Sequence, residues 1–123
     1  MIYLATPYSH PVQAVREARF RAVTRFAADL LKQGQVVFSP ITHSHPLEVL
    51  GNLPQGWEFW QTQDLEFLRL CDELHVLCME GWKESVGVQG EIGWWQRNRP
   101  TPIIYHRYEF DKDSFSTTTR RAE

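Results

Sequence analysis

The sequence predicts an α/β fold in which a mostly parallel sheet is flanked by helices, and two observations support this. Short apolar runs alternate along the chain with longer segments of helical period, an order that favours a parallel sheet with crossover helices. One of these runs, Val36-Val37-Phe38, is continuously apolar, as is typical of a strand covered on both faces. A chain of 123 residues is large enough for one core. We therefore expect a single domain over residues 1–123.

The N-terminal part predicts a strand followed by a long helix. Residues 1–5 are a short apolar run that Thr6-Pro7 ends. Ser9-His10-Pro11 supplies a cap residue and an early proline, so a helix is expected to begin there and to end at Gly34. Apolar side chains recur along this segment at helical spacing. They are Val15, Ala18, Ala22, Val23, Phe26, Ala27, Leu30 and Leu31.

A second strand and a loop follow. Val36-Val37-Phe38 predicts a strand covered on both faces, and Pro40 ends it. Residues 41–56 mix histidine, glycine, asparagine and proline, which predicts a long irregular loop. Loops of this length in compact domains are often functional.

The second half of the chain continues the alternation. Residues 57–71 predict a helix and residues 74–79 a third buried strand. A further helix is expected from Ser85 to about Asn98, followed by a fourth strand at residues 103–105. The polar residues 111–123 predict a flexible tail.

A parallel sheet brings the carboxyl ends of its strands to one edge, where α/β proteins bind their ligands. Four segments are expected along this edge. They are Thr6 to His10, Ser39 to His45, Met79 to Ser85, and Tyr105-His106. Substrate contacts are therefore predicted from Thr6, Tyr8, His10 and His43.

Three glycines mark the start of the last predicted helix, at Gly87, Gly90 and Gly93. Glycine within a helix costs roughly 1 kcal/mol relative to alanine, so close approach of a ligand or another backbone is the expected reason. Helical side chains tilt toward the N-terminus, which leans Glu91 over Gly87 and aims its carboxylate at an opening. Gly87 is therefore predicted to contact the substrate. A tightly packed helix with a solvated Glu91 is the alternative.

Asp64 is the second candidate carboxylate, because it falls in the middle of the apolar side of its helix. A buried carboxylate is costly, so it must meet a partner, a cap or a cavity, and a structural hydrogen bond is the alternative to function. Two carboxylates without a metal suit cleavage at an anomeric carbon, where one is the nucleophile and the other assists the leaving group.

Composition excludes several classes of function. A formal net charge of -2 gives no basic face for polymeric DNA or RNA. No apolar run approaches the roughly 20 residues that span a bilayer, and the N-terminus lacks the pattern of a signal peptide, so a cytoplasmic protein without a membrane partner is expected. His43-Ser44-His45 offers two imidazoles but no evident third ligand, so no metal is predicted.

Three motifs together resemble the nucleoside 2-deoxyribosyltransferase family. They are Tyr3-Leu4-Ala5, Asp64-Leu65-Glu66-Phe67-Leu68 leading to Asp72, and Ser85-x-Gly87-x-x-x-Glu91-Ile92-Gly93. The serine six residues before the glutamate resembles the branch of 2′-deoxynucleoside 5′-phosphate N-hydrolases. The resemblance implies a Rossmann-like fold with flavodoxin-like strand order, a homodimer or higher homo-oligomer, and no cofactor.

The resemblance also implies roles for individual residues. Glu91 would attack C1′, Tyr3 would orient Glu91, and Asp64 would hold or protonate the leaving base. Ser85 would contact the 5′ end of a nucleotide, where a helix N-terminus can hold an anion and where an ordinary N-cap role is compatible.

One segment departs from the family pattern. Where the hydrolases have a glycine and then a phosphate loop with serine and arginine, this chain has Thr6-Pro7-Tyr8-Ser9-His10. Recognition of a 5′-phosphate, and the choice between hydrolase and transferase, therefore stay open. A nucleotide-binding or sensor module that has lost the chemistry is the competing hypothesis, and a structural protein with Trp-rich faces is the third.

Overall fold

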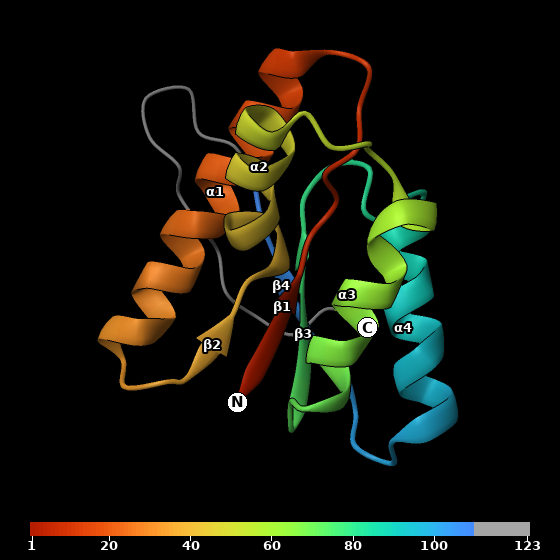
Figure 1. Cartoon of the computed structure of the whole chain (residues 1–123). Coiled ribbons are helices and arrows are strands. Elements are labelled where there is room, and N and C mark those ends of the chain that lie inside the picture. Colours follow the sequence, from red (N-terminus) through yellow and green to blue (C-terminus); the bar gives the residue numbers. More distant parts are fainter. Residues whose placement is uncertain (110–123) are drawn as a thin grey trace.

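The four strands form one all-parallel sheet, in a computed structural model that describes residues 1–109. The strands are β1 (Ile2–Ala5), β2 (Val37–Phe38), β3 (Glu73–Cys78) and β4 (Ile104–Arg107). Their order in space is β2-β1-β3-β4 (Figure 1), the beginning of the flavodoxin-like order. The predicted α/β class and parallel sheet are confirmed. The tail predicted at residues 111–123 lies outside the described residues.

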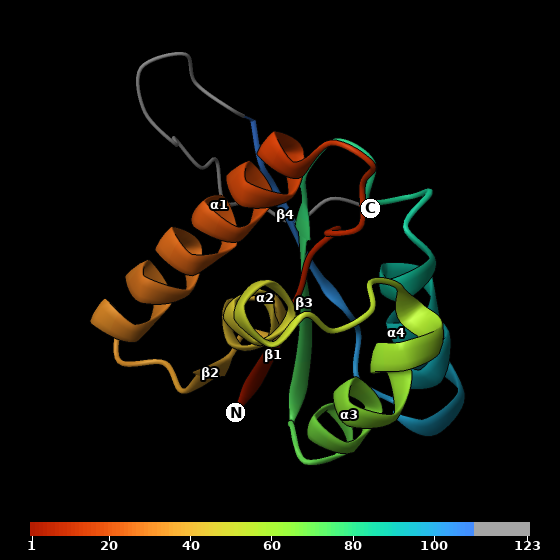
Figure 2. The ribbon, with the colours of Figure 1, turned by 45° about the horizontal axis from the view of Figure 1, so that its top comes forward.

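Four helices flank this sheet, and they separate into two groups. They are α1 (Gln13–Lys32), α2 (Pro40–Gly51), α3 (Trp57–Arg69) and α4 (Val86–Asn98). Figure 2 shows α3 and α4 side by side, with α1 on the other side of the sheet and α2 in front of the strands, between α1 and α3. The carboxyl end of β1 therefore lies close to the first turns of α2, α3 and α4, which is where a ligand of such a fold would bind.

Two apolar cores follow from the alternation of side chains along the strands. In β1, Tyr3 and Ala5 face α3 and α4, whereas Leu4 faces α1. The first core also contains Leu68, Cys71, Leu74, Val76, Val88, Ile92 and Trp95. The second contains Ala22, Val23, Phe26, Ala27, Leu30, Leu77, Met79 and Tyr108. Both faces of the sheet are covered, which explains the continuous apolar runs of β1 and β3.

Helix α1 begins later than Ser9-His10-Pro11 predicts. Val12 stands at its N-cap position, and no side chain caps the helix there. His10 instead stabilises the preceding turn, since its Nδ1 accepts a hydrogen bond from the Val12 N–H at 3.0 Å and its carbonyl accepts one from Arg16. The helix ends at Lys32, and Gly34 follows with a φ of 85°, a conformation that favours glycine.

The prediction that the second strand is covered on both faces is wrong. Strand β2 has only two residues, both half-buried, and Val36 before it is 63% exposed. The reason is its position, because among the strands of residues 1–109 β2 lies at the edge of the sheet and pairs only with β1.

The loop predicted over residues 41–56 is also wrong, since most of it is α2. Ser39 is the N-cap residue, and its Oγ accepts a hydrogen bond from the Thr42 N–H at 3.4 Å. Pro40 ends the strand and also begins the helix, where its missing N–H costs nothing. Asn52 ends α2 in a left-handed conformation with a φ of 54°, which leaves only a short connection to α3.

The elements of the second half agree with the prediction. Helix α3 ends at Arg69, two residues before the expected end, and β3 begins one residue early. Helix α4 has the predicted bounds, with Ser85 at its N-cap. None of the helices within residues 1–109 is both long and apolar enough to cross a bilayer.

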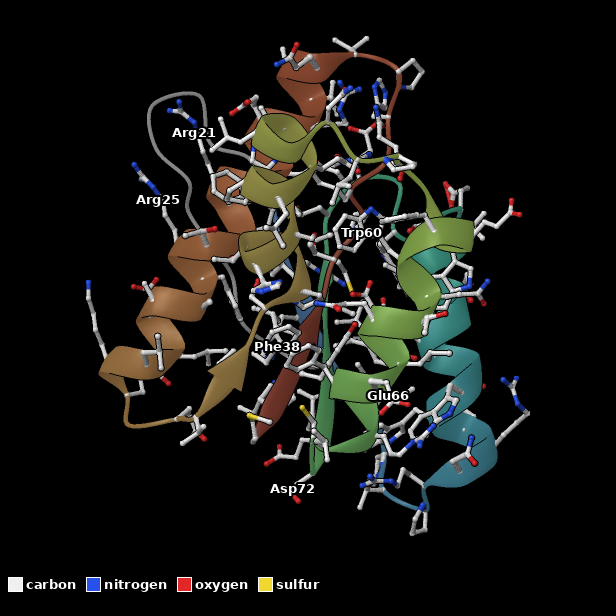
Figure 3. The ribbon with its side chains drawn as sticks, in the orientation of Figure 1. Arg21, Arg25, Phe38, Trp60, Glu66 and Asp72 are labelled. Atoms are coloured by element: carbon white, nitrogen blue, oxygen red, sulfur yellow. The ribbon has the colours of Figure 1, made fainter. Side chains whose placement is uncertain are left out.

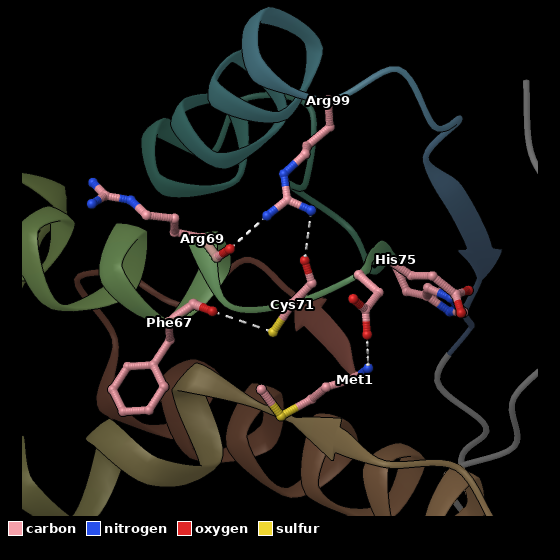
Figure 4. A network of polar contacts seen from close by, with 8 residues as sticks. Met1, Phe67, Arg69, Cys71, His75 and Arg99 are labelled. Carbon is pink, nitrogen blue, oxygen red and sulfur yellow. Dashed lines mark hydrogen bonds and ion pairs between the residues drawn. The ribbon is translucent and has the colours of Figure 1, made fainter.

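Arg99 joins the connections at the amino ends of the strands (Figure 4). Its guanidinium donates hydrogen bonds to the carbonyls of Cys71 at 3.0 Å and Arg69 at 2.5 Å. The amino group of Met1 pairs with the Asp72 carboxylate at 2.5 Å in the same region. These contacts link α3, β3 and β1 at the amino edge of the sheet, opposite the carboxyl edge.

Candidate active site

A cavity of about 580 Å³ opens at the carboxyl edge of the sheet. Its wall comes from the residues after β1, from one face of α2, from the start of α3 and from the entry to α4. The lining residues are Thr6, Tyr8, Ser9, Ile41, Ser44, Glu48, Gln55, Gly56, Trp57, Glu58, Trp60, Gln61, Asp64, Glu84, Ser85, Val86 and Gly87. Three of the four segments predicted at this edge contribute to it. Tyr105-His106 does not, because His106 hydrogen-bonds to His75 across neighbouring strands instead.

Asp64 reaches the cavity from α3, which explains an acidic residue on an apolar helix face. Its side chain is only 8% exposed, and burial raises its pKa from 3.8 to about 7. A buried carboxylate was expected to meet a partner, a cap or a cavity, and in the structure Asp64 meets a cavity. A carboxyl group with this pKa can both give and take a proton near neutral pH.

Glu91 and Tyr3 form a buried pair beside Asp64. The Tyr3 hydroxyl donates a hydrogen bond to Oε2 of Glu91, as the resemblance implies. Burial and the charge of Asp64 raise the pKa of Glu91 well above its ordinary value, against the opposing effect of the Tyr3 hydrogen bond. Burial and the charges of Glu91 and Asp64 likewise raise the pKa of Tyr3. The three side chains thus form one electrostatic unit.

The opening predicted beside Glu91 is not present. Glu91 is 4% exposed and Tyr3 fully buried, and neither lines the cavity, whereas Gly87 and Asp64 do. Both carboxylates lie on the face of the sheet that α3 and α4 cover, but only Asp64 faces the empty space. The side chain of Glu91 is enclosed because α3 packs against α4.

The spacing of the glycines has a different cause from the one expected. A Cβ atom at Gly90 would lie 2.6 Å from the ring of Trp57, and one at Gly87 would lie 3.6 Å from it. Gly90 therefore makes room for an indole ring of α3, rather than for a ligand or another backbone. Because Trp57 and Gly87 also line the cavity, this packing shapes its wall.

Replacing Gly90 by alanine is expected to lower the free energy of unfolding by about 1–3 kcal/mol, because the new methyl group clashes with the rigid Trp57 ring. Gly87→Ala is the matched control, since its methyl group would make an ordinary contact and gain up to about 1 kcal/mol of helix propensity. Urea denaturation measures both. Equal effects of the two substitutions would contradict this account of the motif.

Four of the six predicted substrate-contacting residues line the cavity, namely Thr6, Tyr8, Ser85 and Gly87. Thr6 is 5% exposed, and its Oγ1 has no hydrogen-bond partner among residues 1–109. Burying a hydroxyl without a partner is costly, so a ligand group is a natural acceptor or donor for it.

His10 and His43 lie elsewhere. His10 lines a separate depression on the far side of Arg19 and Glu84, and His43 is exposed beside the rings of Phe38 and Phe67. Both residues were predicted to contact the substrate because they lie in segments that follow strands, which were expected at the carboxyl edge of the sheet. Neither ring points at the cavity, because the first is held in the turn before α1 and the second is on an outer face of α2.

Ser85 caps α4 as expected, with its Oγ accepting a hydrogen bond from the Val88 N–H at 3.2 Å. This bond satisfies one of the free donors at the helix N-terminus. The residue also lines the cavity, so the cap and the predicted ligand contact are compatible in the structure.

Sequence reasoning missed the wall that α2 contributes. Ile41, Ser44 and Glu48 follow one another at intervals of three and four residues and so share one helix face. Ser44 and Glu48 are each 8% exposed. The interval of four residues between two polar side chains was a usable signal, but only after residues 41–56 had been recognised as helical.

His45 supports this wall from behind. Its Nδ1 shares a hydrogen bond of 2.6 Å with the hydroxyl of Tyr8, and its Nε2 lies 3.4 Å from the Glu17 carboxylate. Its ring stacks on Phe20 with the ring centres 4.2 Å apart. Burial and the neighbouring Glu48 carboxylate raise the pKa of Tyr8, so this hydroxyl stays protonated at neutral pH. The tyrosine is thereby fixed in place at the cavity.

The arrangement can be compared with known families. Residues 1–107 match the profile of a family described as a domain of unknown function, DUF1937. A search of curated proteins gave no significant match to the chain. The match covers the whole sheet, all four helices and every residue of the cavity wall. The chain therefore belongs to the DUF1937 family.

Proposed function

We propose that the protein is an N-glycosidase or deoxyribosyltransferase-like enzyme that cleaves the N-glycosidic bond of a nucleoside or its 5′-monophosphate. The observation that carries this proposal is the unit of Asp64, which lines the cavity, with Glu91 and Tyr3 buried beside it. Two carboxyl groups with raised pKa values, one of them hydrogen-bonded by a tyrosine, suit a reaction that needs a nucleophile and a proton donor together.

In the proposed reaction, a carboxylate oxygen of Glu91 forms a bond to C1′ while the C1′–N bond to the base breaks. Asp64 gives its proton to the departing base, so the electron pair of the broken bond ends on a neutral leaving group. Water or an acceptor base then attacks C1′ and releases Glu91, and Asp64 takes up a proton from that nucleophile. Tyr3 holds Glu91 throughout by its hydrogen bond.

The raised pKa values support this division of roles. The charge of Asp64 raises the pKa of Glu91, so ionising both carboxyl groups together is unfavourable and one proton is shared between them near neutral pH. The hydrogen bond from Tyr3 favours the ionised form of Glu91. The proposed reaction requires the shared proton to be on Asp64, the residue that faces the cavity, when the substrate is bound.

The burial of Glu91 favours a second candidate function. With Glu91 at 4% exposure, a ligand in the cavity as it stands meets Asp64 but not the nucleophile. A nucleotide-binding or sensor module, in which Glu91 and Tyr3 only stabilise the core, would have this geometry. Catalysis requires that substrate binding uncover Glu91 on the Gly87 side of the cavity.

Release of free base distinguishes the two functions. The purified protein is incubated with deoxynucleosides and with their 5′-monophosphates, each with and without an acceptor base, and the products are separated by chromatography. Free base indicates hydrolysis and an exchanged base indicates transfer. A ligand-induced rise in melting temperature without either product would contradict the enzymatic proposal and support the binding module.

We also propose a cytoplasmic homodimer or higher homo-oligomer, on the strength of the resemblance to a family whose members complete their sites across subunits. Light scattering of the full chain measures its mass in solution. A monomer that releases base would remove the oligomer from the proposal and leave the chemistry.

A further inference from the structure

The ionisable acidic and basic side chains that line the cavity within residues 1–109 are all acidic. Four carboxyl groups line it, from Glu48, Glu58, Asp64 and Glu84, and within residues 1–109 it has no lysine, arginine or histidine lining it. Glu48 and Asp64 are buried, whereas Glu58 and Glu84 lie at the exposed rim. Negative charge in a recess with low-dielectric walls repels anions and attracts cations more strongly than the same charge on an open surface.

The two arginines on the first turns of α1 hydrogen-bond to backbone carbonyls and do not line the cavity. Arg16 donates a hydrogen bond to the carbonyl of His10. Arg19 donates to the carbonyls of Tyr8 at 3.3 Å, Ser9 at 3.2 Å and Glu80 at 3.1 Å. Arg19 thus joins the connections after β1 and β3, whereas Arg16 holds only the first of them.

Two further features indicate that the cavity is built for a ligand. The buried Oγ1 of Thr6 lacks a hydrogen-bond partner among residues 1–109 and belongs to the lining, so it can bind a sugar hydroxyl. Trp57 and Trp60 line the same space from α3, and Figure 3 shows Trp60 between α2 and α3. The Nε1 of Trp60 donates to the carbonyl of Pro54 at 2.9 Å, which fixes the ring.

A wall of indole rings and carboxylates is expected to bind a positively charged base more tightly than a neutral one. Indole faces attract cations through their negative quadrupole, and the carboxylates add to the same attraction. A neutral base is accepted by stacking alone. A 5′-phosphate is repelled, because the N-terminus of α4 that could hold it is flanked by Glu84 and Glu58 at the cavity rim.

We propose that this cavity selects its substrate by charge, binding a nucleoside with a positively charged base more tightly than one with a neutral base, and excluding 5′-monophosphates. This inference rests on the proposed function for the identity of the ligand as an N-glycoside. The natural substrate class is then a nucleoside with a pyridinium or N-alkylated base, whose leaving group departs as a neutral molecule without needing a proton.

Four probes test the order of binding. They are nicotinamide 2′-deoxyriboside, which is cationic, its uncharged carbon-linked isostere benzamide 2′-deoxyriboside, and the 5′-monophosphates of both. Binding to the full-length Glu91→Gln variant is measured by calorimetry, so that turnover does not interfere. We expect the cationic nucleoside to bind at least about tenfold more tightly than the neutral one, and each nucleoside at least about tenfold more tightly than its monophosphate. Both ratios of dissociation constants should decrease as salt is added.

Neutralising the rim tests the cause of this order. Glu58→Gln combined with Glu84→Gln is expected to reduce both ratios several-fold, because it removes two of the four carboxylates of the wall. Glu66→Gln is the matched control, since Glu66 lies on the same helix, pairs with Arg69 at 3.5 Å and does not line the cavity. It makes the same kind of change in net charge and should leave both ratios unchanged.

Three results would overturn the inference: equal binding of the cationic and neutral nucleosides, a monophosphate that binds as tightly as its nucleoside, or binding of none of the four probes. Equal effects of the rim variant and Glu66→Gln would do so as well. These outcomes are separate from failure of the proposed function. If the protein releases base from a monophosphate in preference to a nucleoside, the enzymatic proposal stands and selection by charge is wrong. If the four probes bind in the expected order but no base is released, selection by charge stands and the enzymatic proposal is wrong.

Discussion

Glu91→Gln is expected to reduce base release by about 10³-fold or more, the largest effect of any single substitution in this protein. The amide has the shape of the carboxyl group and can still accept the Tyr3 hydrogen bond, but it cannot form a glycosyl ester. The reaction is followed by chromatography under single-turnover conditions. A variant with wild-type rates would remove Glu91 as the nucleophile and with it the proposed mechanism.

A second variant separates the loss of a nucleophile from a change of structure. Glu91→Ala leaves space in the core where the carboxyl group stood, and added formate or azide can supply an external nucleophile at C1′. We expect part of the activity to return with azide, and a glycosyl azide to form as product. Glu91→Gln, whose side chain fills that space, should not respond. The Glu66→Gln variant, altered on an exposed part of α3, serves as the control for both.

The second large effect is a loss of stability as the pH rises, caused by Asp64. Burial raises the pKa of this carboxyl group from 3.8 to about 7 in the folded state, so the folded protein binds the proton more tightly than the unfolded chain does. The resulting contribution to stability is complete below about pH 4 and is lost as the pH rises to about 7. The shift corresponds to a loss of about 2–4 kcal/mol across this window.

Asp64→Asn measures this contribution, because asparagine is of similar size and has no charge to bury. Its free energy of unfolding should exceed that of the wild type by an amount that grows between pH 4 and pH 7. Glu91→Gln should show a rise in the same direction, since the pKa of Glu91 is also raised by burial. Urea midpoints at intervals of one pH unit give these values. Parallel curves for wild type and Asp64→Asn would show that Asp64 is not held in its protonated form.

The residues at the centre of the site were predictable because their signals are local or exceptional. A carboxylate in the middle of an apolar helix face is costly, and this singled out Asp64 before any fold was known. Ser85 precedes a helical period in the manner of an N-cap, and the structure has that cap. Glu91 was predicted from the glycine-rich start of its helix and Tyr3 from the resemblance, and their hydrogen bond joins residues that are 88 positions apart in the chain.

The cavity wall was less predictable, and α2 shows why. Pro40, Pro46 and Gly51 are residues that commonly interrupt regular structure, yet all three lie within this helix. The first of them fits because it occupies the first turn, and the helix is further stabilised by packing against α1 and β1. His43 was therefore predicted as a loop residue at the site, whereas Ser44 and Glu48, on the other side of the same helix, line the cavity.

Two things about this protein were determined by the sequence alone: the parallel α/β architecture and the identity of a small set of acidic and capping residues. These depend on apolar spacing and on capping chemistry, which act between residues close together in the chain. The tertiary structure decided that Trp57 packs on Gly90, that Glu91 does not reach the cavity whereas Asp64 does, and that four carboxyl groups line the cavity. Each of these results depends on how α2, α3 and α4 pack around the end of β1. Side chains that are distant in sequence meet there, and no pattern within one segment records their contact.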